Sequence, residues 1–199
     1  MSSPHYSPRI APLPEPLPDG LAQRMAKLVP PGMAAPKLFL SVAQNADLFN
    51  FMVDSAMIGP TGLMDRRSLA KDVREAVILR TCVRARNHYE FNLHVQTISE
   101  RMGLSKLQIA NIKHDVLDTA LWNPNLVSAL ALVDALADTL AVPDTVFAQA
   151  RIHWSEQELI DITMLVGLYT SVAMLVGLIR PDMDSYRARP MEYATPDAP

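Results

Sequence analysis

The stretch EAVILRTCVRARNHYEFNLH, residues 75–94, decides how the rest of the chain is interpreted. In its second half Asn87, Glu90 and His94 are spaced i, i+3 and i+7, so on a helix these three side chains share one face. A carboxylate one turn before an imidazole raises the pKa of the histidine and gives a proton donor and acceptor pair near neutral pH. The spacing predicts an acid–base site, and a second acid, Glu75, precedes it on the same stretch.

Other interpretations of this stretch remain open. A Glu–His pair at i, i+4 is most often a solvated surface pair. His88, Glu90 and His94 are of metal-ligating types, but His88 and Glu90 are two residues apart and face different sides of a helix, so we expect no metal site. Cys82 lies among apolar residues, which favours a buried structural thiol over a nucleophile.

The composition is that of an ordinary globular protein. The 199 residues are 49% hydrophobic and 20% charged, and a chain of this length buries about 70% of its unfolded surface. The net charge of -3 argues against a nucleic-acid partner. The single cysteine allows no intrachain disulfide, and the N-terminus lacks the layout of a signal peptide, so we expect a cytoplasmic protein.

Proline positions divide the chain into three parts. Nine of the sixteen prolines fall in residues 1–36 and four more fall in residues 181–199. Because proline breaks helix interiors, we expect a proline-rich extended arm at 1–36, a helical domain at 37–182 and a C-terminal tail at 183–199.

The middle of the chain shows helical periodicity and no strand pattern. We expect four helices, over residues 37–57, 65–84, 88–102 and 125–140. The first should break near Asn45, and the third should end at Gly103. Capping boxes are expected at Ser105 and Ser155.

The segment TMLVGLYTSVAMLVGLI, residues 163–179, carries no charge. It is shorter than the roughly 20 apolar residues that a membrane span needs. We therefore expect a helix that is buried on all sides in the core of an oligomer, and no membrane partner.

The segments REAVILR, NHYEFNLH, GLSKLQIANI and HWSEQELIDITMLVGLY together resemble the carboxymuconolactone decarboxylase and AhpD-like family over roughly residues 37–182. The resemblance implies an all-α fold, an AhpD-like orthogonal helical bundle. It also implies a homo-oligomer, which in this family is a trimer, a hexamer or a dimer.

The decarboxylase branch of the family is similar in carrying Glu-x-x-x-His, as Glu90 and His94 do here. Its members act on small carboxylated lactones and need no metal or organic cofactor. The resemblance therefore implies a lyase acting on a small organic acid or lactone. His94 is the expected proton donor or base, Glu90 orients it, Glu75 completes the relay and Tyr89 donates a hydrogen bond.

The resemblance also suggests how the substrate is bound. Its carboxylate calls for a guanidinium partner, and the nearby candidates, together with the polar Asn87, are Arg80, Arg84 and Arg86.

The AhpD branch is similar to a thiol peroxidase, with a glutamate, then Cys-x-x-Cys, then a histidine. Alignment on His94 places the two cysteines at Asn87 and Glu90, so this chain lacks both the attacking thiolate and its resolving partner. An AhpD-like oxidoreductase with altered chemistry and a non-catalytic ligand-binding oligomer are the two alternative functions.

Overall fold

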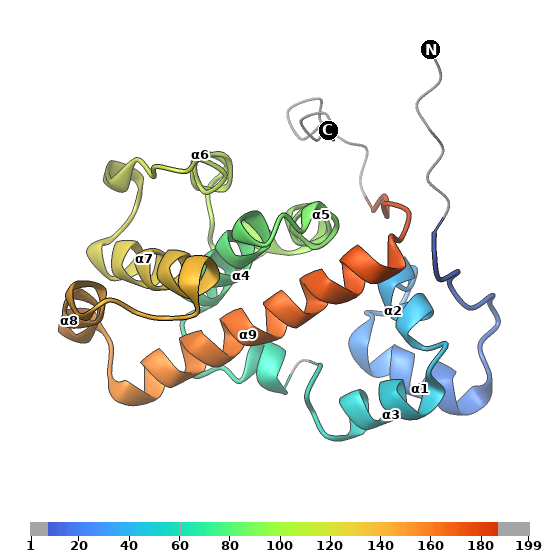
Figure 1. Ribbon diagram of the computed structural model, residues 1–199. Helices are drawn as coiled ribbons and strands as arrows, with labels where there is room; N and C mark the ends of the chain where they lie inside the picture. The colour runs from blue at the N-terminus through green and yellow to red at the C-terminus, as the bar shows by residue number, and fades with distance from the viewer. Residues whose placement is uncertain (1–7, 60, 187–199) are drawn as a thin grey trace, which may run out of the picture. The chain divides into compact units, whose positions relative to one another are not determined.

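The computed structural model describes residues 8–59 and 61–186, and no β-strand occurs in that part of the chain (Figure 1). The prediction of an all-α fold is confirmed. The helices of the described residues form two compact units, one from residues 8–66 with 174–186 and the other from Arg67–Ala173. These units cut across the three sequence-based segments, and most of the expected tail at 183–199 lies outside the described residues.

The first unit contains α1 (Asp19–Leu28), α2 (Lys37–Val42) and α3 (Ala46–Asp54). Helix α1 lies inside the arm that we expected to be extended throughout. It forms because eleven residues without proline follow Pro18, and within them Leu21 and Met25 are spaced one turn apart and are buried. Residues 1–7 of the expected arm lie outside the described residues.

The expected break near Asn45 is confirmed. The Asn45 Oδ1 accepts a hydrogen bond of 3.1 Å from the Leu48 N–H, which makes Asn45 the N-cap of α3. The backbone of the arm also pairs with this unit, since the Arg9 N–H donates to the Ile179 carbonyl at 2.8 Å and the Leu13 N–H to Leu40 at 3.2 Å.

The second unit contains α4 (Lys71–Arg84), α5 (His88–Thr97), α6 (Lys106–Asn111), α7 (Pro124–Thr139) and α8 (Asp144–His153). Helix α4 packs against α5 and α7, and α7 packs against α8 (Figure 1). Side chains that are fully buried in this core include Ala76, Val77, Leu79, Ile109, Ile112, Ala129, Leu130, Val133 and Ile162.

Two helix boundaries in this unit differ from the sequence-based prediction. Helix α4 begins six residues later than expected, because Ala70 is extended and Arg67 has a positive φ of 61°. The helix expected over 88–102 ends at Thr97 and continues as the short 3-10 helix η2 (Ser99–Met102). Gly103 terminates it with a φ of 102°, a left-handed conformation that glycine adopts without strain.

Helix α9 (Glu156–Ile179) is longer than predicted because it starts at the capping box formed by Ser155 and Glu158. It is the one helix in the described part of the chain that is long and apolar enough to cross a membrane, and a third of its most apolar window is buried. A core helix of a soluble protein can be as long and as apolar, although it is mostly buried. The expected burial on all sides does not hold within one chain, since Ile160 and Met164 are 63% and 50% exposed.

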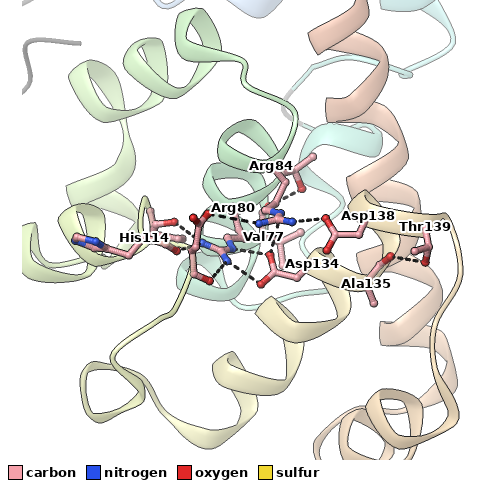
Figure 2. Close-up of polar contacts among 11 residues, drawn as sticks. Val77, Arg80, Arg84, His114, Asp134, Ala135, Asp138 and Thr139 are labelled. Atoms are coloured by element: carbon pink, nitrogen blue, oxygen red, sulfur yellow. Dashed lines mark hydrogen bonds and ion pairs between the residues drawn. The ribbon is translucent and has the colours of Figure 1, made fainter. Parts of the chain in front are cut away.

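A buried arginine connects α4 to α7 and to the loop that follows α6 (Figure 2). Arg80 is fully buried, and its Nε and Nη2 donate to the two carboxylate oxygens of Asp134 at 2.6 and 2.7 Å. Its remaining hydrogens reach the carbonyls of Ile112 at 2.8 Å, His114 at 2.6 Å and Asp115 at 3.3 Å. The guanidinium is thus neutralised and fully hydrogen-bonded, which a buried charge requires.

We expect Asp134→Ala to lower the free energy of unfolding by about 3–5 kcal/mol, because it leaves the Arg80 charge buried without a counter-ion. Urea unfolding followed by circular dichroism measures the loss. The matched control is Glu156→Ala, which removes the carboxylate of the exposed Arg151–Glu156 pair and should cost less than about 1 kcal/mol. Equal losses in the two variants would contradict a structural role for the Arg80 network.

Candidate functional site

Side chains from α4, α5, η2 and α9 meet inside the second unit. We call this group the His94 cluster, and its members are Glu75, Glu90, His94, Ser99 and Tyr169. Each is at most 5% exposed. The cluster is therefore shielded from bulk water, and its charges interact more strongly than they would at the surface.

Both ring nitrogens of His94 have partners. The Nδ1 lies 3.0 and 3.1 Å from the two carboxylate oxygens of Glu75. The Nε2 lies 3.3 Å from the Tyr169 hydroxyl and 3.5 Å from Oε1 of Glu90. The Tyr169 ring also meets the imidazole edge to face, at 5.5 Å between the ring centroids. The imidazole orientation is thus fixed from both sides.

The carboxylates control the protonation of His94. Burial by itself lowers the pKa of this histidine, but the charges and hydrogen bonds of Glu75 and Glu90 outweigh burial and raise the pKa to about 10. Burial raises the pKa of Glu75, yet His94 and Ser99 lower it below its usual value overall. At neutral pH the cluster therefore holds an imidazolium that donates to the Glu75 carboxylate.

Two further hydroxyl groups complete this arrangement. The Ser99 hydroxyl donates to Oε1 of Glu75 at 2.6 Å, so the carboxylate is held by η2 as well as by His94. Burial and the nearby carboxylates raise the pKa of Tyr169 well above its usual value. The phenol is consequently neutral across the physiological range.

Asn87 lies at the N-terminus of α5, where a positive φ of 54° at Arg86 turns the chain out of α4. Its Oδ1 accepts a hydrogen bond of 3.1 Å from the Glu90 N–H and caps the helix. The Asn87 Nδ2 and the Glu90 Oε2 are both buried and have no hydrogen-bond partner. The predicted substrate-binding role of Asn87 stays a prediction.

The structure brings together Glu75, Glu90 and His94, but it divides their roles differently from our expectation. Glu75 makes the close contact that orients His94, and Glu90 faces the Nε2. Tyr169 brings a phenol to His94, which sequence reasoning did not expect. Tyr89 is buried on α5, and its expected role as a hydrogen-bond donor stays a prediction. His88 is exposed, and the cluster does not include it.

Two of the three arginines expected to bind a substrate carboxylate are engaged in ion pairs, and the third is exposed beside Asn87. Arg80 is saturated by Asp134 and by backbone carbonyls (Figure 2). Arg84 pairs with Asp138 and lies 3.7 Å from Asp134. Arg86 is exposed. Arg80 and Arg84 therefore form structural ion pairs with Asp134 and Asp138.

Sequence reasoning missed Tyr169 and Ser99. Tyr169 is the only aromatic residue in the uncharged segment 163–179. A buried tyrosine hydroxyl usually has a hydrogen-bond partner. This residue was therefore the one signal in the segment that could have predicted a contribution of α9 to the site. Nothing local distinguishes Ser99, since its contact with Glu75 joins residues 24 positions apart.

A cavity of about 430 Å³ also lies in the second unit, and none of its lining residues belongs to the His94 cluster. It is lined by Leu132, Val142, Phe147, Glu156, Leu159, Ile160, Thr163 and Met164.

No protein-family model and no curated protein matches this chain. Solved structures do match. The debrominase Bmp8 is 15% identical, covers 89% of this chain and 92% of its own, and has a TM-score of 0.73. A complex of a cysteine-to-alanine Bmp8 variant with 2,3,4-tribromopyrrole is 16% identical, with the same coverage and a TM-score of 0.67.

A third similar structure is ATU0492 from Agrobacterium tumefaciens, a protein of unknown function that has been assigned as a putative antioxidant defence protein AhpD. It is 20% identical, covers 72% of this chain and 96% of its own, and has a TM-score of 0.61. These likenesses show the fold: the chain has the AhpD-like helical fold. The predicted resemblance is confirmed at the level of the fold.

We expect the stability of the protein to fall as pH rises from about 6.5 to about 10. The folded chain keeps the His94 proton up to a pKa of about 10, whereas the unfolded chain loses it near the usual value of 6.5. The slope should approach 1.4 kcal/mol per pH unit, roughly the value for one proton. Glu75 has the opposite sign, because its lowered pKa adds stability that is lost as pH falls below 4.5.

Urea unfolding across this pH range measures the effect. His94→Gln should flatten the alkaline fall, and the matched control His153→Gln, on an exposed residue of α8, should keep it. A fall of the same slope in both variants would contradict the coupling between Glu75 and His94.

Proposed function

We propose that this protein is a cofactor-free enzyme that acts on a small organic acid or lactone by acid–base chemistry. The reaction is either a decarboxylation or a proton transfer between a lactone and its enol form. The observation that supports the proposal best is the buried position of the His94 side chain between two carboxyl groups and a phenol. The imidazole is held by Glu75 through Nδ1 at 3.0 Å and faces Glu90 and Tyr169 through Nε2.

The high pKa of His94 suits one kind of step. An imidazolium with a pKa of about 10 keeps its proton against water but yields it to a strong base, such as the carbon of an enolate. Loss of CO₂ from an activated acid, or removal of a proton beside a carbonyl, produces such an enolate. His94 would then protonate the carbon through Nε2, while Glu75 holds Nδ1 and stabilises the charge before transfer.

An AhpD-like oxidoreductase is the first alternative function, and the likeness to Bmp8 and ATU0492 favours it. The thiol needed for that chemistry is poorly placed, however. Cys82 is the only cysteine, it is 1% exposed, and burial together with Glu90 and Glu75 raises its pKa well above its usual value. Its thiolate is therefore scarce at neutral pH.

A ligand-binding homo-oligomer without catalysis is the second alternative. The exposed apolar residues of α9 support burial against another copy of the chain. A catalytic role has one advantage over this alternative, because two buried polar atoms lack hydrogen-bond partners: Oε2 of Glu90, which belongs to the cluster, and Nδ2 of the nearby Asn87.

We expect Cys82 to react with an aromatic disulfide reagent only after unfolding. In the native protein, burial and the raised pKa of the thiol should slow release of the coloured thiolate at least about 100-fold relative to the same protein in guanidinium. Fast reaction of the native thiol, combined with peroxide turnover that Cys82→Ala abolishes, would instead establish the oxidoreductase alternative.

We expect His94→Gln and Glu90→Gln to reduce turnover of a lactone substrate by about 10²–10⁴-fold, which is the usual contribution of a general acid or base. In the wild-type protein turnover should fall above pH 10, where the His94 pKa lies. Glu75→Gln should move this alkaline limb to lower pH, because it removes the charge that raises the pKa.

The readout is proton exchange or CO₂ release, followed by NMR over a panel of small acids and lactones. The matched controls are His153→Gln and Glu100→Gln, both on exposed residues of the same unit. Unchanged turnover in both His94→Gln and Glu90→Gln would exclude the proposed function.

A further inference from the structure

The cavity of about 430 Å³ lies between α7, α8 and the first part of α9, away from the His94 cluster. All of its lining residues lie within Arg67–Ala173, the second unit. Its volume falls in the range of about 300–1,000 Å³ that is usual for small-molecule sites. At about 30 Å³ for each water-sized group, the cavity holds a ligand of roughly a dozen non-hydrogen atoms.

Most of the lining is apolar, and part of it is exposed to solvent. Leu132 and Leu159 are 3% and 7% exposed and form the buried part of the lining. Phe147, Ile160 and Met164 are 49%, 63% and 50% exposed. Exposed apolar side chains that gather around one hollow are typical of a binding site, whereas single ones need no explanation. Because a bound apolar group removes this surface from water, the cavity favours a ligand with an apolar body.

The α9 side of the cavity carries its polar groups. Glu156, Ile160 and Thr163 are spaced i, i+4 and i+7, so they share one face of the helix. The Thr163 hydroxyl donates to the Leu159 carbonyl at 2.8 Å, so its proton is engaged. Glu156 is the one charged residue of the lining. It lies about 12 Å along the helix axis from Met164, which places the charge at one end of the cavity.

The charges around the cavity favour a cation. Helices α8 and α9 carry one arginine and four acidic residues, besides His153: Arg151, Asp144, Glu156, Glu158 and Asp161. The aspartates of α7, Asp134 and Asp138, are paired with Arg80 and Arg84. The positive end of the α9 dipole is equivalent to about half a charge, so the surroundings stay negative. Arg151 lies 3.4 Å from Glu156 in an exposed ion pair, which is weak enough for an ammonium group to share the carboxylate.

We propose that this cavity binds a small arylalkylamine, with its ammonium group on the Glu156 carboxylate and its aromatic ring against Phe147 and Met164. An aromatic body suits this end of the cavity, because Phe147 offers a ring partner and the thioether of Met164 a polarisable contact. The site is independent of the proposed acid–base function, since none of its lining residues belongs to the His94 cluster.

The test follows the methyl group of Met164 by NMR, in protein labelled with carbon-13 at its methionine methyl groups. The probe is 4-phenylbutylamine, and its neutral and anionic counterparts are 4-phenylbutanol and 4-phenylbutanoate. We expect the amine to shift the Met164 signal with a Kd of about 0.1–1 mM, which is usual for a ligand of roughly eleven non-hydrogen atoms. The alcohol should bind about threefold more weakly and the acid about tenfold more weakly. The signal of Met174, an exposed residue of α9 outside the lining, should not move.

Two variants test the apolar and the charged part of the site separately. Thr163→Phe fills the cavity from an exposed position and should abolish binding of the amine, whereas Gln157→Phe, at an exposed position outside the lining, should leave the Kd unchanged. Glu156→Gln should weaken binding of the amine about threefold and leave binding of the alcohol unchanged. Its control is Glu158→Gln, which lies outside the lining and keeps the capping box with Ser155. This control should change the Kd less than about twofold.

The remaining outcomes overturn the proposal in distinguishable ways. Equal Kd values for the three probes, or a wild-type Kd for the amine in Glu156→Gln, would exclude Glu156 as the ammonium site. An unmoved Met164 signal at saturating amine would exclude the cavity as a binding site. If that signal instead changes on dilution of the protein alone, a second copy of the chain covers the cavity. His94→Gln should leave the Kd unchanged, so failure of the acid–base function leaves this site in place.

Discussion

The requirement that buried charges be neutralised organises the second unit, and helix α4 carries two of them. Glu75 and Arg80 are both fully buried, and they face different neighbours because they are five residues apart on the helix. Glu75 is satisfied by His94 and Ser99, and Arg80 by Asp134 and the carbonyls that follow α6. Neither charge tolerates loss of its partners, so α4 fixes α5 and η2 on one side and α7 on the other.

The same constraint explains why the site is built on helices rather than on loops. His94 is positioned by packing of α5 on α4 and by Tyr169 from α9, so its ring has little freedom to rotate. Pre-organised groups of this kind need no rearrangement when charge develops nearby. The unpartnered atoms of Asn87 and Glu90 are the exception to an otherwise satisfied cluster, and they lie on the turn of α5 nearest the surface.

Local patterns in the sequence were sufficient to predict much of the fold and about half of the residues of the site. Periodicity and capping signals located α7, the break at Asn45 and the end at Gly103, because these features depend on residues within a few positions. The same spacing placed Glu90 and His94 on one face. Tyr169, Ser99 and the true partner of Arg80 escaped prediction, because each contact joins residues 24 to 75 positions apart. Only tertiary packing determines which buried polar groups meet at such separations.

Asn87 illustrates how narrow the choice of residue becomes when one side chain serves two purposes. Its oxygen ends the helix and its nitrogen faces the interior. Aspartate, serine and threonine reproduce the oxygen but offer no amide hydrogen, whereas glutamine offers the amide on a longer chain that is a poor cap. Asparagine is the single natural amino acid that supplies both at this length. Substitutions of Asn87 should therefore give two kinds of variant. One kind folds but lacks the amide donor, and the other kind folds poorly.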